Sequence, residues 1–246
     1  MKEQTIPHVK RDDLSWALDA VLPHAGKTRG KVPGKAPYVG MEIRSDRISE
    51  WELNKRLYLY ATDGHTIGIA RIPISEVSIW EPFYLPTGGE AESLQKWIRP
   101  HRKAEEEQRV VLVLGELSEE EPLPALHVGL QDGELRESND LLDSSAFILT
   151  EGKVDLKALM DLMHLYEAKD IEADEYTFDP DLLDRFTGHA GHFKGDRLRM
   201  RPNHITKDKE GITYTTIAVG TDFHGAILGL TQREGLNAVL DGWFPE

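Results

Sequence analysis

Two strand-like runs meet at a tight turn in residues 59–72, which read LYATDGHTIGIARI. Apolar and β-branched residues fill both runs, and Asp63-Gly64 stands between them. An Asp-Gly pair favours a tight hairpin because glycine adopts positive φ without steric cost. We therefore predict an antiparallel β-hairpin whose tip lies at Asp63 and Gly64.

Helix and strand patterns alternate on both sides of this hairpin. Apolar residues recur at helical spacing in three segments, and Asp179-Pro180 opens a fourth, shorter helix. The expected helices cover 10–22, 91–99, 154–166 and 181–186, and the expected strands cover 38–44, 56–63, 66–74, 109–115, 125–131, 145–150, 197–205, 212–220 and 225–231. The order is helix, three strands, helix, three strands, then two helices and three strands. It predicts an α+β fold of repeated helix-plus-antiparallel-strand units.

The hairpin pattern recurs near the end of the chain. Aligning residues 59–72 with VGTDFHGAILGL (219–230) matches Thr62 with Thr221, Asp63 with Asp222 and His65 with His224. This match indicates duplication of a helix-plus-strand unit. A shared turn preference is the alternative, because Asp and Gly recur in hairpins for local steric reasons.

The hairpin also resembles a motif of a known family. Residues 61–65 (ATDGH), between two strands and after an N-terminal helix, resemble the ATDGHR-type hairpin of the bacterial DNA polymerase III β sliding clamps. Residues 240–245 (LDGWFP) are similar to the family's -IDGRFPDY- segment, and FYLP (83–86) resembles the segment that leads into the second helix of its domain. The resemblance is good over 9–150 and weaker over 151–246. It implies a sliding-clamp (DNA clamp) fold, with a clamp-like domain at 1–150 and a second, shortened clamp-like domain at 151–246.

The resemblance implies a function without chemistry. Clamps of this family tether a polymerase, and their helices line a central hole threaded by double-stranded DNA. Their rings commonly contain six domains, so two domains per chain imply a homo-oligomer, most simply a trimer. The chain is therefore expected to be a DNA polymerase processivity factor of a phage or mobile element, with a DNA polymerase and a clamp loader as partners. Phosphate contacts would come from bases on or just beyond the first two helices, namely Lys10, Arg11, Lys96, Arg99, Arg102 and Lys103.

The second unit favours an alternative function. Residues 151–190 hold four bases and eleven acids, whereas the sequence RLRMR (197–201) alternates so that Arg197, Arg199 and Arg201 share one face of a strand. Such a face could contact DNA or an acidic partner, or it could be a solvated sheet face. The alternative is a clamp-fold accessory protein, such as a recombination directionality factor, that binds and redirects a recombinase without encircling DNA. Its partner contacts would be the three arginines together with Trp243 and Phe244, because arginine and aromatic residues anchor many interfaces.

Composition restricts the classes of partner and the compartment. The chain has 246 residues, with 29 Lys and Arg against 43 Asp and Glu, which gives a net charge of −14. A polyanion is repelled by the chain as a whole, so any nucleic-acid binding must be local. There is no cysteine, which fits a reducing compartment, and no run approaches the roughly 20 apolar residues of a membrane span. We expect a cytoplasmic protein, in the host cytoplasm if the gene is a phage's, with no membrane partner.

Catalytic and metal-binding patterns are not supported by the sequence. No GxxxxGK[ST], GxGxxG, HExxH or GxSxG motif occurs. His189 and His192, with His204, Asp222 and His224 further along, could supply metal ligands, but their spacing is nonspecific and a polar loop is the simpler interpretation. We therefore predict no enzymatic activity, no catalytic residues, no cofactor and no metal site.

Overall fold

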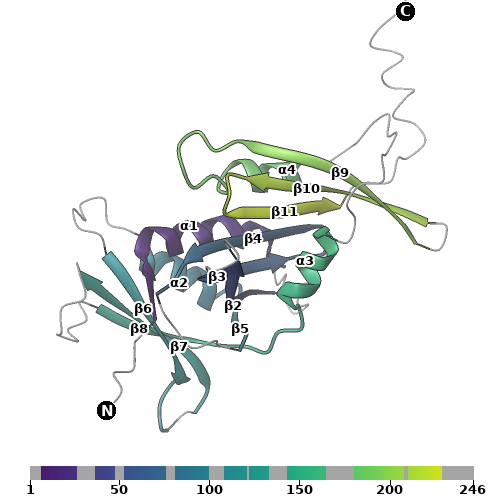
Figure 1. Cartoon of the computed structure of the whole chain (residues 1–246). Helices are drawn as coiled ribbons and strands as arrows, with labels where there is room; N and C mark the ends of the chain where they lie inside the picture. The colour runs from purple at the N-terminus through teal and green to yellow at the C-terminus, as the bar shows by residue number, and fades with distance from the viewer. Residues whose placement is uncertain are drawn as a thin grey trace, which may run out of the picture.

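The computed structural model describes residues 7–26, 37–47, 53–75, 81–99, 108–120, 122–132, 143–164, 180–207 and 210–228. These residues form two antiparallel sheets and four α-helices, so the α+β class expected from the sequence is confirmed (Figure 1). The helices are α1 (Arg11–Val21), α2 (Glu90–Ile98), α3 (Leu156–His164) and α4 (Pro180–Thr187), and the 3-10 helix η1 (Leu22–His24) follows α1. The strands are β1 (His8–Lys10), β2 (Tyr38–Arg47), β3 (Leu53–Thr62), β4 (Thr66–Pro73), β5 (Phe83–Pro86), β6 (Gln108–Glu116), β7 (Pro124–Asp132), β8 (Asp143–Ile148), β9 (Leu198–Lys207), β10 (Glu210–Val219) and β11 (Phe223–Leu228).

Residues 7–150 consist of two halves with the same order of elements. The first half is β1, α1, β2, β3 and β4, and the second is β5, α2, β6, β7 and β8. The halves exchange their first strands, because β1 pairs with β6 and β5 pairs with β2. One sheet therefore has the order β1-β6-β7-β8, and the other contains β5-β2-β3-β4. The sequence alignment of 59–72 with 219–230 did not reveal this duplication inside the first 150 residues.

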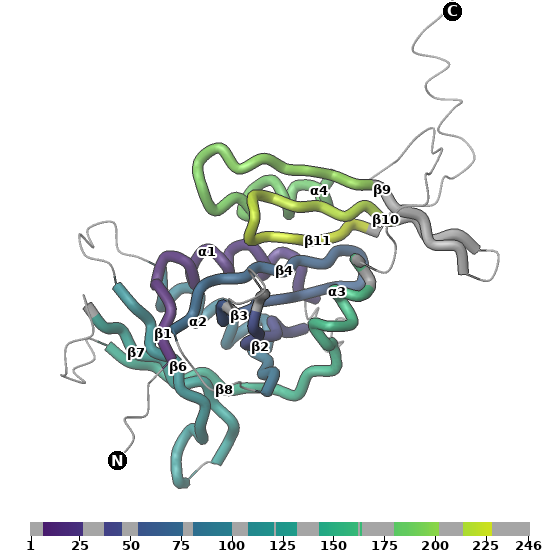
Figure 2. The backbone as a smooth tube through the Cα atoms, in the orientation of Figure 1, coloured from purple at the N-terminus to yellow at the C-terminus, as the bar shows by residue number. Residues whose placement is uncertain are grey.

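The C-terminal hairpin extends the second of these sheets. Strand β11 pairs antiparallel with β4, and Gly225 lies opposite Gly68 in that register. The sheet consequently has seven strands in the order β5-β2-β3-β4-β11-β10-β9. Figure 2 shows the hairpin of β10 and β11, in yellow, running beside β4. Strands from both ends of the chain thus form one continuous surface.

Helices α1 and α2 bury their apolar sides in one core between the sheets. Leu14, Leu18 and Val21 of α1 and Leu94 and Ile98 of α2 are at most 1% exposed. They pack with strand residues of both sheets in a single cluster. This spacing follows the 3.6-residue period from which the helices were predicted. We call the side of the seven-stranded sheet that carries α1 the α1 face.

Helix α3 covers the opposite side of the seven-stranded sheet, which we call the α3 face. Leu156 and Leu159 pack there against Tyr58, Ile69 and Tyr214 in a second cluster, separate from the main core. Two tyrosines hold the segment that leads to the helix. The hydroxyl oxygen of Tyr38 accepts hydrogen bonds from the backbone N–H groups of Lys153 and Val154. The Tyr84 hydroxyl donates a hydrogen bond to the backbone carbonyl of Val154.

The seam between β4 and β11 depends on two glycines. A Cβ on Gly68 would lie 2.3 Å from a ring carbon of His24, and a Cβ on Gly225 would lie 2.5 Å from a ring carbon of Phe186. The absence of side chains lets both rings close on the sheet, with their centroids 4.4 Å apart. Phe186 belongs to α4, so α4 packs on the α1 face of the seam.

Most predicted elements are confirmed within about two residues. The predicted hairpin tip is also confirmed, since Gly64 has φ of 88° between β3 and β4. The placement of α3 was not foreseen. The apolar spacing of 154–166 predicts one core-facing stripe of Leu156, Leu159, Met160, Met163 and Tyr166; of these, Met160 and Met163 are only partly buried, and Tyr166 lies outside the described residues.

Candidate functional site

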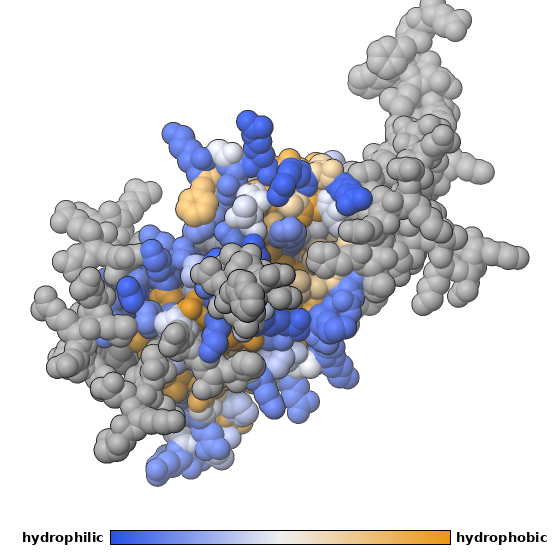
Figure 3. Space-filling view, viewed as in Figure 1, coloured by the Kyte–Doolittle hydropathy of each residue, from blue (hydrophilic) through white to orange (hydrophobic). Residues whose placement is uncertain are grey.

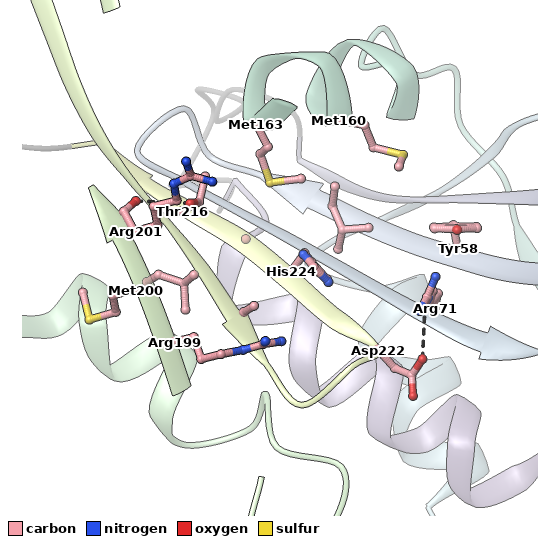
Figure 4. A pocket seen from close by; sticks show the side chains of 14 residues that line it. Tyr58, Arg71, Met160, Met163, Arg199, Met200, Arg201, Thr216, Asp222 and His224 are labelled. Carbon is pink, nitrogen blue, oxygen red and sulfur yellow. Dashed lines mark hydrogen bonds and ion pairs between the residues drawn. The ribbon is translucent and has the colours of Figure 1, made fainter. Parts of the chain in front are cut away.

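A groove lies on the α3 face where the two parts of the seven-stranded sheet meet. Its volume is about 520 Å³, and strands β3, β4, β9, β10 and β11 contribute residues to it together with α3. We call it the α3 groove (Figure 4). Its lining is formed by Tyr58, Ile69, Arg71, Met160, Met163, Arg199, Met200, Arg201, Thr216, Ile217, Ala218, Asp222, His224 and Gly225. Apolar and cationic groups are therefore combined in one concave surface.

The apolar part of the groove comes from α3 and from β3 and β4. Met160 and Met163 point from α3 toward the sheet (Figure 4), and Tyr58 of β3 and Ile69 of β4 also belong to the lining. Thr216 and Ala218 of β10, which have small side chains, also line the groove. Methionine is flexible and polarisable, so a methionine wall adapts to apolar side chains of different shape.

The cationic part of the groove comes chiefly from β9. Arg199 and Arg201 are exposed and line the groove from the same strand. A third arginine, Arg71, is held by Asp222, whose Oδ1 lies 3.2 Å from the Arg71 Nε. That pair is neutral overall, and Arg199 and Arg201 are the other two arginines among the described residues that line the groove. Figure 3 shows that hydrophilic side chains otherwise dominate the visible described surface of the molecule.

A partly buried polar cluster near the seam connects α4 with the β3–β4 hairpin. Arg185 of α4 forms an ion pair with Asp63 of the β3–β4 hairpin, with Nη1 and Oδ2 2.7 Å apart. Burial by itself would raise the pKa of Asp63, but hydrogen bonds from Arg185 and from the backbone N–H groups of Thr66 and His65 hold that pKa below its usual value. Asp63 therefore stabilises the hairpin turn, as expected from its position in the turn, and the contact of the turn with α4.

His24 lies next to this ion pair and is fully buried. Burial lowers the pKa of His24 to about 3, and the positive charge of Arg185 acts in the same direction. Neither ring nitrogen has a hydrogen-bond partner. The ring is thus neutral and serves as an aromatic wedge at the seam.

The six residues proposed for DNA contact differ in their exposure to solvent. Lys10, Lys96 and Arg99 are exposed on or beside α1 and α2. Arg11 is only 4% exposed, and its guanidinium donates to the carbonyl oxygens of Ile98 and Arg99 at 2.8 Å each. Arg11 therefore caps the C-terminal end of α2, which leaves it little access to a phosphate. Arg102 and Lys103 lie outside the described residues.

The exposed surface of α1, α2 and α4, which we call the helix surface, carries more acids than bases among the described residues. Its exposed or partly exposed bases are Lys10, Lys96, Arg99 and Arg185, and Arg99 lies 3.4 Å from Asp19. Its exposed or partly exposed acids are Asp12, Asp13, Asp19, Glu90, Glu92, Asp181 and Asp184. Such a surface repels a duplex more than it attracts one.

The residues proposed for partner contact divide in a similar way. Arg197, Arg199 and Arg201 are all exposed, and the last two line the α3 groove. Trp243 and Phe244 lie outside the described residues. Local periodicity assigned Met160 and Met163 to the core and so missed them as groove residues. The described residues contain no group of three or more His, Asp or Glu that could hold a metal ion, and none of their helices has the length and apolar content needed to cross a bilayer.

Comparison with known proteins finds similarity only among solved structures. No family model and no curated protein matches the chain. The DNA polymerase sliding clamp of Bacillus subtilis is 9% identical, with a TM-score of 0.49, and the match covers 99% of this chain and 68% of that one. The DNA polymerase III β chain of Streptococcus pneumoniae is 10% identical, with a TM-score of 0.48 and coverage of 98% and 68%. The DNA polymerase III subunit β of Pseudomonas aeruginosa is 9% identical, with a TM-score of 0.45 and coverage of 97% and 68%. All three come from the family whose hairpin residues 61–65 resemble.

Proposed function

We propose that the chain is a sliding-clamp-like protein without catalytic activity, which holds a segment of a partner DNA enzyme in the α3 groove. The observation that carries this proposal is the groove itself, in which an apolar wall of α3 faces two exposed arginines of β9. Arginine and adaptable apolar side chains are the usual anchors of protein interfaces, and a concave surface excludes water around them.

The chemistry of the groove defines the partner segment. An apolar side chain of the partner would contact Met160, Met163 and Ile69, and an acidic side chain would pair with Arg199 or Arg201. Arginine binds carboxylates through a planar set of donors, so the rim would orient the segment as well as attract it. The segment is therefore expected to combine leucine, phenylalanine or a similar residue with neighbouring Asp or Glu.

The helix surface favours an accessory role over encirclement of DNA. Acids outnumber bases there among the described residues, and Arg11 is used to cap α2. A protein that redirects a recombinase or another DNA enzyme needs the partner groove but no positively charged hole. The accessory role therefore needs only a feature that the described surface has, namely the α3 groove.

A ring-forming processivity factor is the second candidate. Its support is the presence of open sheet edges, since in the described residues β8 pairs only with β7 and β9 only with β10. Exposed edges are templates for pairing with another chain. Under this candidate, the divisions 1–150 and 151–246 act as domains of a homo-oligomer, and Lys10, Lys96 and Arg99, with Arg102 and Lys103, supply the contacts to double-stranded DNA.

Selection from a random peptide library displayed on phage tests the groove. We expect the wild-type protein to enrich sequences that place an acidic residue beside a large apolar one. The double variant Arg199→Glu/Arg201→Glu should not enrich them, whereas Arg197→Glu should, because Arg197 lies just before β9 and does not line the groove. Equal enrichment by all three proteins would contradict the proposal that the α3 groove binds the partner segment.

A further inference from the structure

The loop between α4 and β9 (residues 188–197) exposes a large aromatic side chain. Phe193 is 65% exposed, more than Val113 at 44%, Met200 at 41% or Leu123 at 39%. Leaving most of a phenylalanine ring in water forgoes much of the free energy of its burial. The α3 groove does not include it. Phe193 therefore needs an explanation outside the function proposed above.

Two further rings support Phe193 from beneath. The Phe193 ring contacts the His192 ring at a centroid distance of 4.5 Å, and His192 stacks on Trp16 of α1 at 4.2 Å and 28°. The Nε2 of His192 also lies 3.1 Å from Oδ1 of Asp13. The three rings form an aromatic ladder that begins on a core helix and ends in solvent.

The backbone of the loop is fixed as well. One carboxylate oxygen of Asp196 accepts hydrogen bonds from the N–H groups of His192 and Phe193, at 2.8 and 2.9 Å. The N–H of Asp196 donates back to the carbonyl of Phe193, and Gly195 supplies the positive φ of 97° that the turn requires. The ring is thus held in place before any ligand arrives, which lowers the entropy cost of binding.

Positive charge flanks the ring although the chain as a whole is acidic. Lys194 and Arg197 are exposed on either side of the turn. The carboxylate of Asp196 is engaged by backbone N–H groups, and that of Asp13 contacts His192. Both carboxylates thus face partners within the fold, whereas the side chains of Lys194 and Arg197 are exposed to solvent at the tip of the loop.

We propose that this loop binds unpaired DNA, with Phe193 stacking on a base and with Lys194 and Arg197 contacting the adjacent phosphates. A rigid exposed ring beside cations matches the two repeating features of a single strand, its flat bases and its charged backbone. A partner protein with an apolar pocket would explain the ring but would not require the flanking bases. This contact is independent of the α3 groove, so either can fail alone.

Fluorescence anisotropy with a labelled oligothymidylate of about 20 nucleotides tests the proposal. Phe193→Ala should weaken binding about 5- to 150-fold, the range that loss of one stacked base produces. Phe193→Trp should bind at least as well as the wild type. With only two phosphate contacts, the logarithm of the affinity should fall with the logarithm of salt concentration with a slope of about −1.4.

Phe193→Leu separates stacking from simple apolar contact. It keeps an apolar side chain but has no aromatic face, so it should bind the oligonucleotide nearly as poorly as Phe193→Ala. Val113→Ala, an exposed apolar change on β6, is the matched control and should have no effect. If the leucine variant binds as well as the wild type, or if a duplex of the same length binds as tightly as the single strand, base stacking is wrong. Failure of the wild type to bind the oligonucleotide at low salt would also overturn the proposal that the loop binds unpaired DNA. The result of the phage selection for the α3 groove does not depend on this outcome.

Discussion

At the residue scale, a few glycines and one buried neutral histidine determine how the β4–β11 seam packs. Gly68 and Gly225 face each other across the β4–β11 seam and admit the rings of His24 and Phe186. Sequence analysis identified the Asp63-Gly64 turn because an Asp-Gly pair has a local steric meaning. It could not identify Gly68 or Gly225, because their role depends on a strand about 150 residues away.

The turn residue Gly64 provides the simplest test at this scale. Its φ of 88° is strained for any residue with a Cβ, so Gly64→Val should destabilise the fold by about 1 kcal/mol or more. Thermal unfolding measures the effect. Gly115→Val is the control, since a Cβ there meets only ordinary contacts with His127 at 3.5 Å. Equal melting temperatures for the two variants would place the strained turn elsewhere.

His24 should make the fold sensitive to acid. Its pKa is about 3 in the folded state against an ordinary 6.5, so the unfolded chain takes up a proton that the folded chain does not. Stability should therefore fall as the pH drops from about 6.5 toward 3, by a total on the order of 5 kcal/mol. Urea unfolding at a series of pH values measures this loss.

His24→Phe should remove most of that loss. Both ring nitrogens of His24 lack partners, so phenylalanine gives up no hydrogen bond and can stack on Phe186 in the same place. We expect this variant to be at least as stable as the wild type at neutral pH and to have a flatter pH profile. Asp63 still loses its ion pair at lower pH, so a small residual slope remains. An unchanged pH profile in the variant would mean that another group causes the acid sensitivity.

At the element scale, local periodicity predicts which segments are helices but not where they pack. The repeat of apolar residues in α1 and α2 gave both helices and their buried sides. The same reasoning gave α3, yet nothing in its own sequence shows that it crosses to the other face of the sheet. That placement depends on hydrogen bonds that the Tyr38 hydroxyl accepts and the Tyr84 hydroxyl donates, and both tyrosines are distant in the chain. Arg11 illustrates the same limit, because its role as a cap of α2 is visible only once the helices are adjacent.

Removing these hydroxyl groups should loosen α3. Tyr38→Phe leaves two backbone N–H groups without their acceptor and should destabilise the segment by about 1–3 kcal/mol. Tyr84→Phe removes one bond of 3.2 Å and should have a smaller effect. Hydrogen exchange of the amides in 153–163 measures both. If the two variants exchange like the wild type in this segment, the tyrosines do not anchor the helix.

At the scale of the whole molecule, one continuous seven-stranded sheet creates the α3 groove from two distant parts of the chain. The sequence predicted the arginine alternation of β9, and two of those three arginines line the groove. It could not predict their methionine neighbours, because α3 and β9 meet only through the β4–β11 seam. The open edges of β8 and β9 raise the separate question of self-association.

Light scattering at micromolar concentration distinguishes the two candidate functions. A processivity ring requires a closed oligomer, most simply a trimer, and Lys10→Ala/Lys96→Ala/Arg99→Ala should then reduce retention on a closed DNA circle without altering the fold. The accessory role, which the helix surface favours, requires neither result. If the protein is a monomer at all accessible concentrations, the ring-forming processivity factor is excluded.

The affinity of the α3 groove for a selected peptide, measured by fluorescence anisotropy, tests the proposed function. We expect Arg199→Glu/Arg201→Glu and Met163→Gln each to weaken peptide binding by about tenfold or more, since groove anchors dominate such interfaces. Arg197→Glu and Lys96→Glu should bind like the wild type. Unchanged affinity in the groove variants, or an equal loss in the two controls, would contradict the proposal that this groove holds the partner.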